Sequence, residues 1–228
     1  MFNSRVFVAE LIGTFALVFI GAGAGIANAG LLGVAFAHGL TVIAFAYTFG
    51  YISGTHINPA VTFGLALTNT IKWGEAIFYW IAQFLGAVAA AFLLRTFVSD
   101  ISAGATIGSL TNSMPFSAAL VEIVLTFFLV SAVLHNAVAG KSGGFAGLAI
   151  GSTLIASILV GGPLTGASLN PARTFGPALV LGDYQDPTMY AIYFAGPLLG
   201  SALAVGVFRF LNSTSAIPEE TKKPLKKK

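Results

Sequence analysis

The sequence contains no cysteine, which excludes disulfide bonds, thiolate metal sites and thiol nucleophiles. Charged residues are also scarce, because Asp, Glu, Lys and Arg make up only 8% of the 228 residues, against roughly 25% in an average soluble domain. Hydrophobic residues account for 56%. A soluble globular protein is therefore excluded, and we expect a single membrane domain over residues 1–228.

The positive net charge comes from the C-terminal end of the chain. Five of the eleven Lys and Arg residues lie within the last seven positions, 222–228. Because the excess basic residues are confined to one terminus, a nucleic-acid-binding face is not expected. We interpret residues 212–228 as a solvated polybasic tail near anionic lipid headgroups.

Long apolar stretches predict the membrane-spanning segments, since a helix needs about 20 residues to cross the hydrocarbon. Six such stretches cover residues 6–28, 34–52, 76–98, 116–138, 145–162 and 188–211. Two further apolar pieces, 58–68 and 170–181, are too short to cross and follow polar residues. We expect them to be re-entrant half-helices beside a cavity, because irregular backbone at this depth is not tolerated against lipid.

The chain contains an internal repeat. The triplet Asn58-Pro59-Ala60 returns as Asn170-Pro171-Ala172, a lag of 112 residues. We place repeat 1 at about residues 5–98 and repeat 2 at about 116–211. Because each repeat holds three spans, an odd number, the second copy must enter the membrane upside down. The predicted fold class is an all-α membrane bundle of six transmembrane helices and two re-entrant half-helices.

The distribution of charge predicts the orientation, because basic residues favour the cytoplasmic ends of spans. With both termini in the cytoplasm, the inner ends hold Arg5, Lys72, Lys141 and Arg209, and the outer loops hold Asp100, Asp183 and Asp186, with Arg95 as the exception. We predict a multi-pass protein of the cell membrane, plasma or inner. Residues 99–115, rich in Ser, Gly and Thr, form an outer loop whose path the sequence does not determine.

Each Asn-Pro-Ala triplet has the features of a helix start, because Pro loses no hydrogen bond there and Asn is a strong cap. As a cap, the side-chain oxygen of Asn58 or Asn170 accepts from backbone N–H groups, which leaves the NH2 group free to donate sideways. Two such starts entering from opposite faces meet near the midplane, where their positive dipole ends repel cations. A water there meets no continuing chain of donors, so proton transfer is interrupted.

The motifs within residues 56–62 and 168–173 resemble those of the aquaporin, or major intrinsic protein, family, and the resemblance extends from about residue 5 to residue 211. It implies a right-handed bundle of six tilted helices and two half-helices, assembled as a homotetramer with a pore in each subunit. The implied partners are water, small neutral solutes and the lipid bilayer. No cofactor, metal or nucleic acid is expected, and the protein is not expected to be an enzyme.

Arg173 lies three residues after Asn170, on nearly the same face of the half-helix and about 4.5 Å further along, which places it in the outer half of the pore. The resemblance assigns the rest of the selectivity filter to His38, Ile158 and Ala167. Many water channels carry an aromatic residue, a histidine and a small hydroxyl or thiol residue at these three places. The set found here resembles that of plant tonoplast intrinsic proteins and predicts water conduction with some ammonia or urea leakage.

Glu10 and Glu122 lie inside apolar spans and share the lag of 112 residues. Proton coupling is one interpretation. Their equivalence favours another, in which each carboxylate accepts hydrogen bonds from the backbone of a re-entrant loop. Thr14 and Thr126, four residues further on, share those helical faces. The resemblance assigns His56, just before the first motif, to shaping its loop and the inner vestibule.

Two alternative functions remain. Glycerol channels of the family usually carry an aspartate where Thr174 stands, a basic residue at Ala178 and a proline-containing pair at Tyr193-Phe194. These positions favour a water channel, but a filter without the usual aromatic residue could admit glycerol slowly. A secondary transporter shares inverted repeats and broken helices, but it needs a coupled-ion site for which the spans offer few charged residues.

Overall fold

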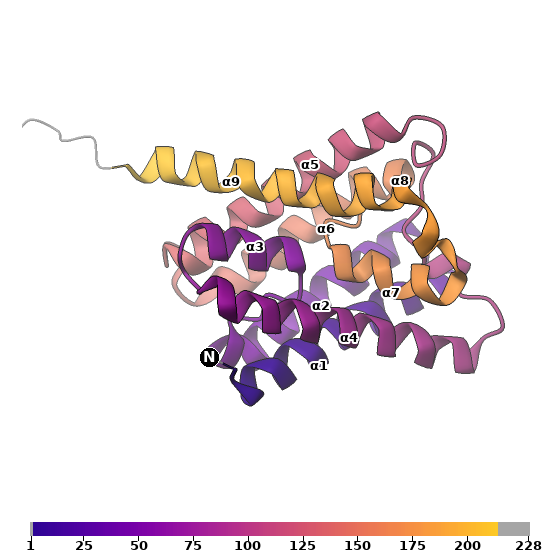
Figure 1. Cartoon of the computed structure of the whole chain (residues 1–228), viewed down its shortest axis with the longest axis horizontal. Coiled ribbons are helices and arrows are strands. Elements are labelled where there is room, and N and C mark those ends of the chain that lie inside the picture. Colours follow the sequence, from indigo (N-terminus) through magenta and orange to yellow (C-terminus); the bar gives the residue numbers. More distant parts are fainter. Residues whose placement is uncertain (1, 214–228) are drawn as a thin grey trace, which may run out of the picture.

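Long tilted helices form a bundle around two shorter ones in the computed structural model, which describes residues 2–213 (Figure 1). Within that part of the chain, six helices are long and apolar enough to cross a membrane. They are α1 (Ser4–Ile26), α2 (Gly30–Ser53), α4 (Trp73–Phe97), α5 (Pro115–Ala132) with η2 (Val133–Val138), α6 (Ala146–Thr165), and α8 (Pro187–Tyr190) with η5 (Ala191–Ala195) and α9 (Gly196–Asn212). The six predicted spans are confirmed, with boundaries shifted by a few residues. The predicted tail lies outside the described residues beyond Ser213.

The two half-helices are α3 (Pro59–Leu67) and α7 (Pro171–Leu181). At 1.5 Å per residue they are about 14 and 17 Å long, roughly half of the 30 Å hydrocarbon thickness. Figure 1 shows them inside the bundle, with α3 toward one end and α7 toward the other. The short apolar pieces at 58–68 and 170–181 are therefore confirmed as half-helices.

The long helices pack in pairs that follow the repeat. α1 packs on α2 and α4, α5 packs on α6 and α9, and α2 meets α6 where the repeats join. A Cβ atom on Gly39 would lie 2.7 Å from the carbonyl oxygen of Gly151, and one on Gly151 would lie 2.5 Å from that of Gly39. Only glycine permits this approach, so the repeats join through matching backbone surfaces.

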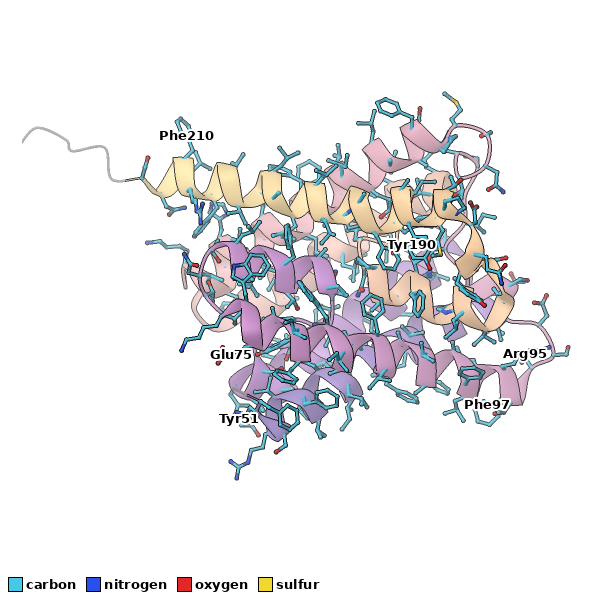
Figure 2. All side chains as sticks on the ribbon, in the orientation of Figure 1. Tyr51, Glu75, Arg95, Phe97, Tyr190 and Phe210 are labelled. Atoms are coloured by element: carbon cyan, nitrogen blue, oxygen red, sulfur yellow. The ribbon has the colours of Figure 1, made fainter. Side chains whose placement is uncertain are left out.

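The two ends of the described chain lie at the same end of the bundle (Figure 1), and we call this the inner end, following the charge prediction. Exposed aromatic side chains stand out at both ends, with Tyr51 and Phe210 at the inner end and Phe97 at the outer end (Figure 2). Aromatic residues at both ends are typical of helices that cross two membrane interfaces. Arg95, the basic exception, lies beside Phe97 at the outer end (Figure 2).

Candidate functional site

A cavity inside the bundle is bordered by both cap residues, Asn58 and Asn170, and by Arg173. The remaining wall is mostly apolar, because the spans of both repeats contribute aliphatic side chains. These are Leu17, Val42, Leu129, Val133, Ile150 and Leu154. The two half-helices and four of the spans thus enclose one space, which makes it the candidate lumen.

The asparagines cap the two half-helices as the triplets predict. The Asn58 Oδ1 atom accepts a hydrogen bond from the Ala60 backbone N–H at 2.8 Å, at the start of α3. The Asn170 Oδ1 atom accepts from the backbone N–H groups of Ala172 and Arg173 at 3.0 and 3.2 Å, at the start of α7. Both side-chain oxygens are therefore committed to helix caps.

The NH2 groups of the two asparagines are not left wholly free, which differs from the prediction. The Asn58 Nδ2 atom donates to the carbonyl of Leu169 at 2.8 Å, and the Asn170 Nδ2 atom donates to the carbonyl of Ile57 at 2.8 Å. This reciprocal pair joins loop 1 (residues 54–58) to loop 2 (residues 166–170). Because each NH2 group has two hydrogens, one hydrogen on each asparagine is not used in this pair, and both asparagines border the cavity.

Both loops hold strained backbone. Thr55 and Ile57 in loop 1 have φ values of 48° and 43°, and Ala167 and Leu169 in loop 2 have φ values of 44° and 54°. Positive φ is unfavourable for residues with a Cβ atom and most of all for β-branched ones. Such residues persist only where the surroundings hold them, so each loop needs strong external support.

Glu10 provides that support for loop 1. One carboxylate oxygen, Oε1, accepts from the Ser53 hydroxyl at 2.7 Å and from the His56 backbone N–H at 2.8 Å. The other, Oε2, accepts from the Ile57 backbone N–H at 2.7 Å and from the Gln83 side-chain amide at 2.8 Å. The fully buried carboxylate is thus occupied by four donors.

Glu122 repeats the arrangement at loop 2. Its Oε1 atom accepts from the Thr165 hydroxyl at 2.7 Å and from the Ser168 backbone N–H at 2.9 Å, and its Oε2 atom accepts from the Leu169 backbone N–H at 2.8 Å. In both repeats, each carboxylate oxygen therefore receives one backbone N–H of the loop. The neighbouring Thr14 and Thr126 hydroxyls take no part, since both are buried without a hydrogen-bond partner among the described residues.

His56 borders the cavity at loop 1. Its Nδ1 atom lies 3.1 Å from the Thr62 hydroxyl on α3, and its ring stacks on Tyr79 with a centroid separation of 4.4 Å. Gln83 also donates to the Thr62 hydroxyl at 2.9 Å. Gln83 was not among the residues predicted from the sequence, although a polar residue inside an apolar span is a signal for such a site.

The four predicted filter residues all border the cavity and are buried: His38 on α2, Ile158 on α6, Ala167 in loop 2 and Arg173 on α7. Glycine makes room for one of them, because a Cβ atom on Gly21 of α1 would overlap the imidazole ring of His38. Two polar and two apolar side chains from four separate elements therefore border the same cavity.

His38 and Arg173 contact each other within this set. The His38 Nδ1 atom lies 2.9 Å from the Val34 carbonyl, and its Nε2 atom receives a hydrogen bond from Arg173 Nε at 3.3 Å. Since a carbonyl only accepts and a guanidinium only donates, the ring carries its proton on Nδ1. Both ring nitrogens of His38 are therefore occupied, one by the Val34 carbonyl and one by the Arg173 guanidinium.

A residue of the outer loop (residues 98–114) completes the contacts of Arg173. The Arg173 Nη1 atom donates to the Thr106 hydroxyl oxygen, which also accepts a hydrogen bond from the Thr174 hydroxyl at 3.0 Å. Backbone hydrogen bonds from Ser109 to Pro163 and from Leu110 to Leu164, at 3.0 and 2.9 Å, fix the loop on the end of α6. Thr106 could not be found from the sequence, because a Ser, Gly and Thr-rich loop has no periodic pattern.

Comparisons with known proteins agree over nearly the whole chain. Residues 1–208 match the family described as "Major intrinsic protein". "Probable aquaporin TIP2-2" of Oryza sativa subsp. japonica is 42% identical over 221 residues, covering 91% of this chain and 87% of that protein. "Aquaporin TIP2-1" of Arabidopsis thaliana is 38% identical over 235 residues, covering 94% and 90%. The X-ray structure of the aquaglyceroporin from Plasmodium falciparum matches with a TM-score of 0.74 and 28% identity, covering 94% of this chain and 97% of that one.

Proposed function

Because the chain belongs to the major intrinsic protein family, whose members are aquaporin channels and not enzymes, we propose that it conducts water, admits ammonia or urea as minor solutes, and excludes protons and ions. The family membership and the six spans make it an integral multi-pass membrane protein. The solutes, the roles of the individual site residues, the assembly and the membrane are proposals.

The observation that carries the proposal is the meeting of the two capped half-helices inside the lumen. The side-chain oxygen of Asn58 and of Asn170 accepts from a helix start, and one N–H of each side chain donates to the opposite loop. The remaining N–H of each asparagine is therefore the group that can donate to a solute in the cavity. A water that accepts from them must point its own hydrogens away in both directions. Two positive helix ends at the same place add a barrier to cations.

The choice of solute follows from the constriction. Arg173 uses one N–H on His38 and one on Thr106, which leaves three of its five N–H groups. The facing wall offers the side chains of Ile158 and Ala167, which carry no polar group. A small solute that passes Ile158 and Ala167 can therefore accept a hydrogen bond from Arg173, and water, ammonia and urea are all small acceptors.

Glu10 and Glu122 are proposed to support the loops and not to carry protons. Every carboxylate oxygen is occupied by at least one donor from a loop backbone. A carboxylate that gained a proton would lose one of these acceptors and release strained backbone. Protonation of Glu10 or Glu122 would therefore weaken the support of its loop.

A glycerol facilitator is the second candidate, favoured by the structural match to an aquaglyceroporin and by a filter that contains no Phe, Tyr or Trp. Thr174 is an argument against glycerol, because glycerol channels of the family usually carry an aspartate at this position. The Thr174 hydroxyl instead bonds to Thr106 and to Ser168 and supports the filter. We expect glycerol to pass much more slowly than water.

The homotetramer is proposed from the family resemblance. Cytoplasmic termini are proposed from the charge pattern. The relatives are named as TIP-type aquaporins, which gives no support to the plasma or inner membrane predicted from the sequence. A fluorescent fusion of the full chain, imaged in the source cells, identifies the membrane.

The proposed function is tested with purified protein in liposomes. Osmotic shrinkage measures water, and internal alkalinisation after addition of an ammonium salt measures ammonia, each against protein-free liposomes. We expect non-saturating fluxes with a low activation energy and no need for an ion gradient. Saturation, dependence on an ion gradient or a steep activation energy would contradict a passive pore and favour a transporter.

A further inference from the structure

Tyr193 lies at the centre of an ordered hydrogen-bond chain that joins the outer loop to loop 2. Its hydroxyl donates to the Thr165 carbonyl at 2.7 Å and lies 2.8 Å from the Thr111 hydroxyl. Because a phenol has one hydrogen, Tyr193 must accept from Thr111. Thr111 in turn accepts from the Gly108 backbone N–H at 3.0 Å. All these hydrogen bonds therefore run in one direction, from the outer loop inward.

Thr165 directly precedes loop 2 and contacts both Tyr193 and Ala167, a predicted filter residue. Its hydroxyl donates to Glu122 and accepts from the Ala167 backbone N–H at 3.1 Å. Ala167 borders the cavity beside Arg173. The phenol of Tyr193 is thus two residues away from a filter wall that is held at positive φ.

Because loop 2 is strained, the hydrogen bond from Tyr193 to Thr165 should affect the shape of the loop. Ala167 and Leu169 keep φ values of 44° and 54° only while the surroundings hold them. Removing the Tyr193 hydroxyl leaves the buried Thr165 carbonyl without that donor. We expect the start of loop 2 to relax in that case and to displace Ala167, which would change the width of the constriction.

The first repeat contains an equivalent tyrosine contact next to a loop that carries no predicted filter residue. The Tyr79 hydroxyl donates to the Ser53 carbonyl at 2.8 Å, and Ser53 is the repeat mate of Thr165 at the lag of 112 residues. Tyr79 serves loop 1, which holds none of the four predicted filter residues. It is therefore a matched internal control for the loss of one buried phenol hydroxyl.

We propose that Tyr193 is a positioning residue for solute size selection, acting with Thr111 through Thr165 on Ala167. The inference rests on the proposed function of the pore. The outer loop would then help to set the width of the filter through Tyr193, which does not border the cavity.

The test compares Tyr193→Phe, Thr111→Val, their double variant and Tyr79→Phe in liposomes, with osmotic shrinkage for water and urea uptake for the larger solute. We expect Tyr193→Phe to raise the ratio of urea to water permeability by about threefold. The effect should be smaller than the roughly tenfold change in discrimination that one methylene group causes in a size-selective site. Thr111→Val should raise the ratio in the same direction, and the double variant should add little. Tyr79→Phe should leave the ratio unchanged, whatever its effect on absolute flux.

An unchanged ratio in Tyr193→Phe, or an equal rise in Tyr79→Phe, would overturn the proposal. If Tyr193→Phe does not reconstitute, Thr111→Val decides alone, because it keeps the phenol and removes only its link to the outer loop. A wild-type protein that conducts no water would instead contradict the proposed function, so the two failures are distinguishable.

Discussion

Replacing Glu122 by glutamine tests the support of loop 2. Its two oxygens accept one backbone N–H each, from Ser168 and from Leu169. A glutamine has one oxygen and one NH2 group, so whichever way its amide is turned, one buried N–H faces another donor. An unsatisfied buried donor costs about 1–3 kcal/mol, and we expect this loss of stability in Glu122→Gln.

The same reasoning applies to Glu10, where His56 and Ile57 supply the two backbone N–H groups. Glu10→Gln should therefore lose a similar free energy of unfolding. Glu122→Met, which removes both acceptors, should lose about 2–6 kcal/mol.

Thermal unfolding in detergent, followed by circular dichroism, measures the effect, with about 2–4 °C of Tm expected for each kcal/mol. Asp183→Asn is the control, because Asp183 is exposed at the outer end and should leave the Tm unchanged. Flux should fall in Glu122→Gln without a change in its pH profile. A variant with wild-type Tm and a shifted pH profile would refute loop support and revive proton coupling.

Two further predictions concern the constriction. Ile158→His combined with Ala167→Thr restores polar groups to the wall and should lower the ratio of ammonia to water flux in liposomes; an unchanged ratio would show that these positions do not form the filter. Thr106→Val removes one acceptor of Arg173 and should lower the water permeability by about threefold or more, since each net hydrogen bond is worth about 1 kcal/mol, whereas wild-type permeability in that variant would show that Thr106 does not orient the guanidinium.

The sequence predicts the architecture well because the signals lie in short segments and in the repeat. The spans follow from the length of apolar stretches, and the half-helices follow from Asn-Pro caps, which is why α3 and α7 begin at Pro59 and Pro171 as expected. The repeat lag relates Glu10 to Glu122. These signals are local or periodic, so no knowledge of the tertiary structure is required.

The contacts between distant segments could not be predicted in the same way. The donation of each cap asparagine to the opposite loop depends on how closely two separate loops approach. The position of Thr106 over Arg173 depends on backbone contacts between an aperiodic loop and the end of α6. The π-helical turns Val133–Val138 and Ala191–Ala195 have no sequence signal of their own.

The paired half-helices are proposed to pass water and to interrupt proton transfer at Asn58 and Asn170. The most direct measurement follows water and protons in the same liposomes, loaded with a pH-sensitive dye and given an osmotic step and then a pH step with the membrane potential clamped by potassium and valinomycin. We predict water permeability well above that of protein-free liposomes, with proton flux equal to theirs. Proton flux that rises with the amount of protein would contradict the account.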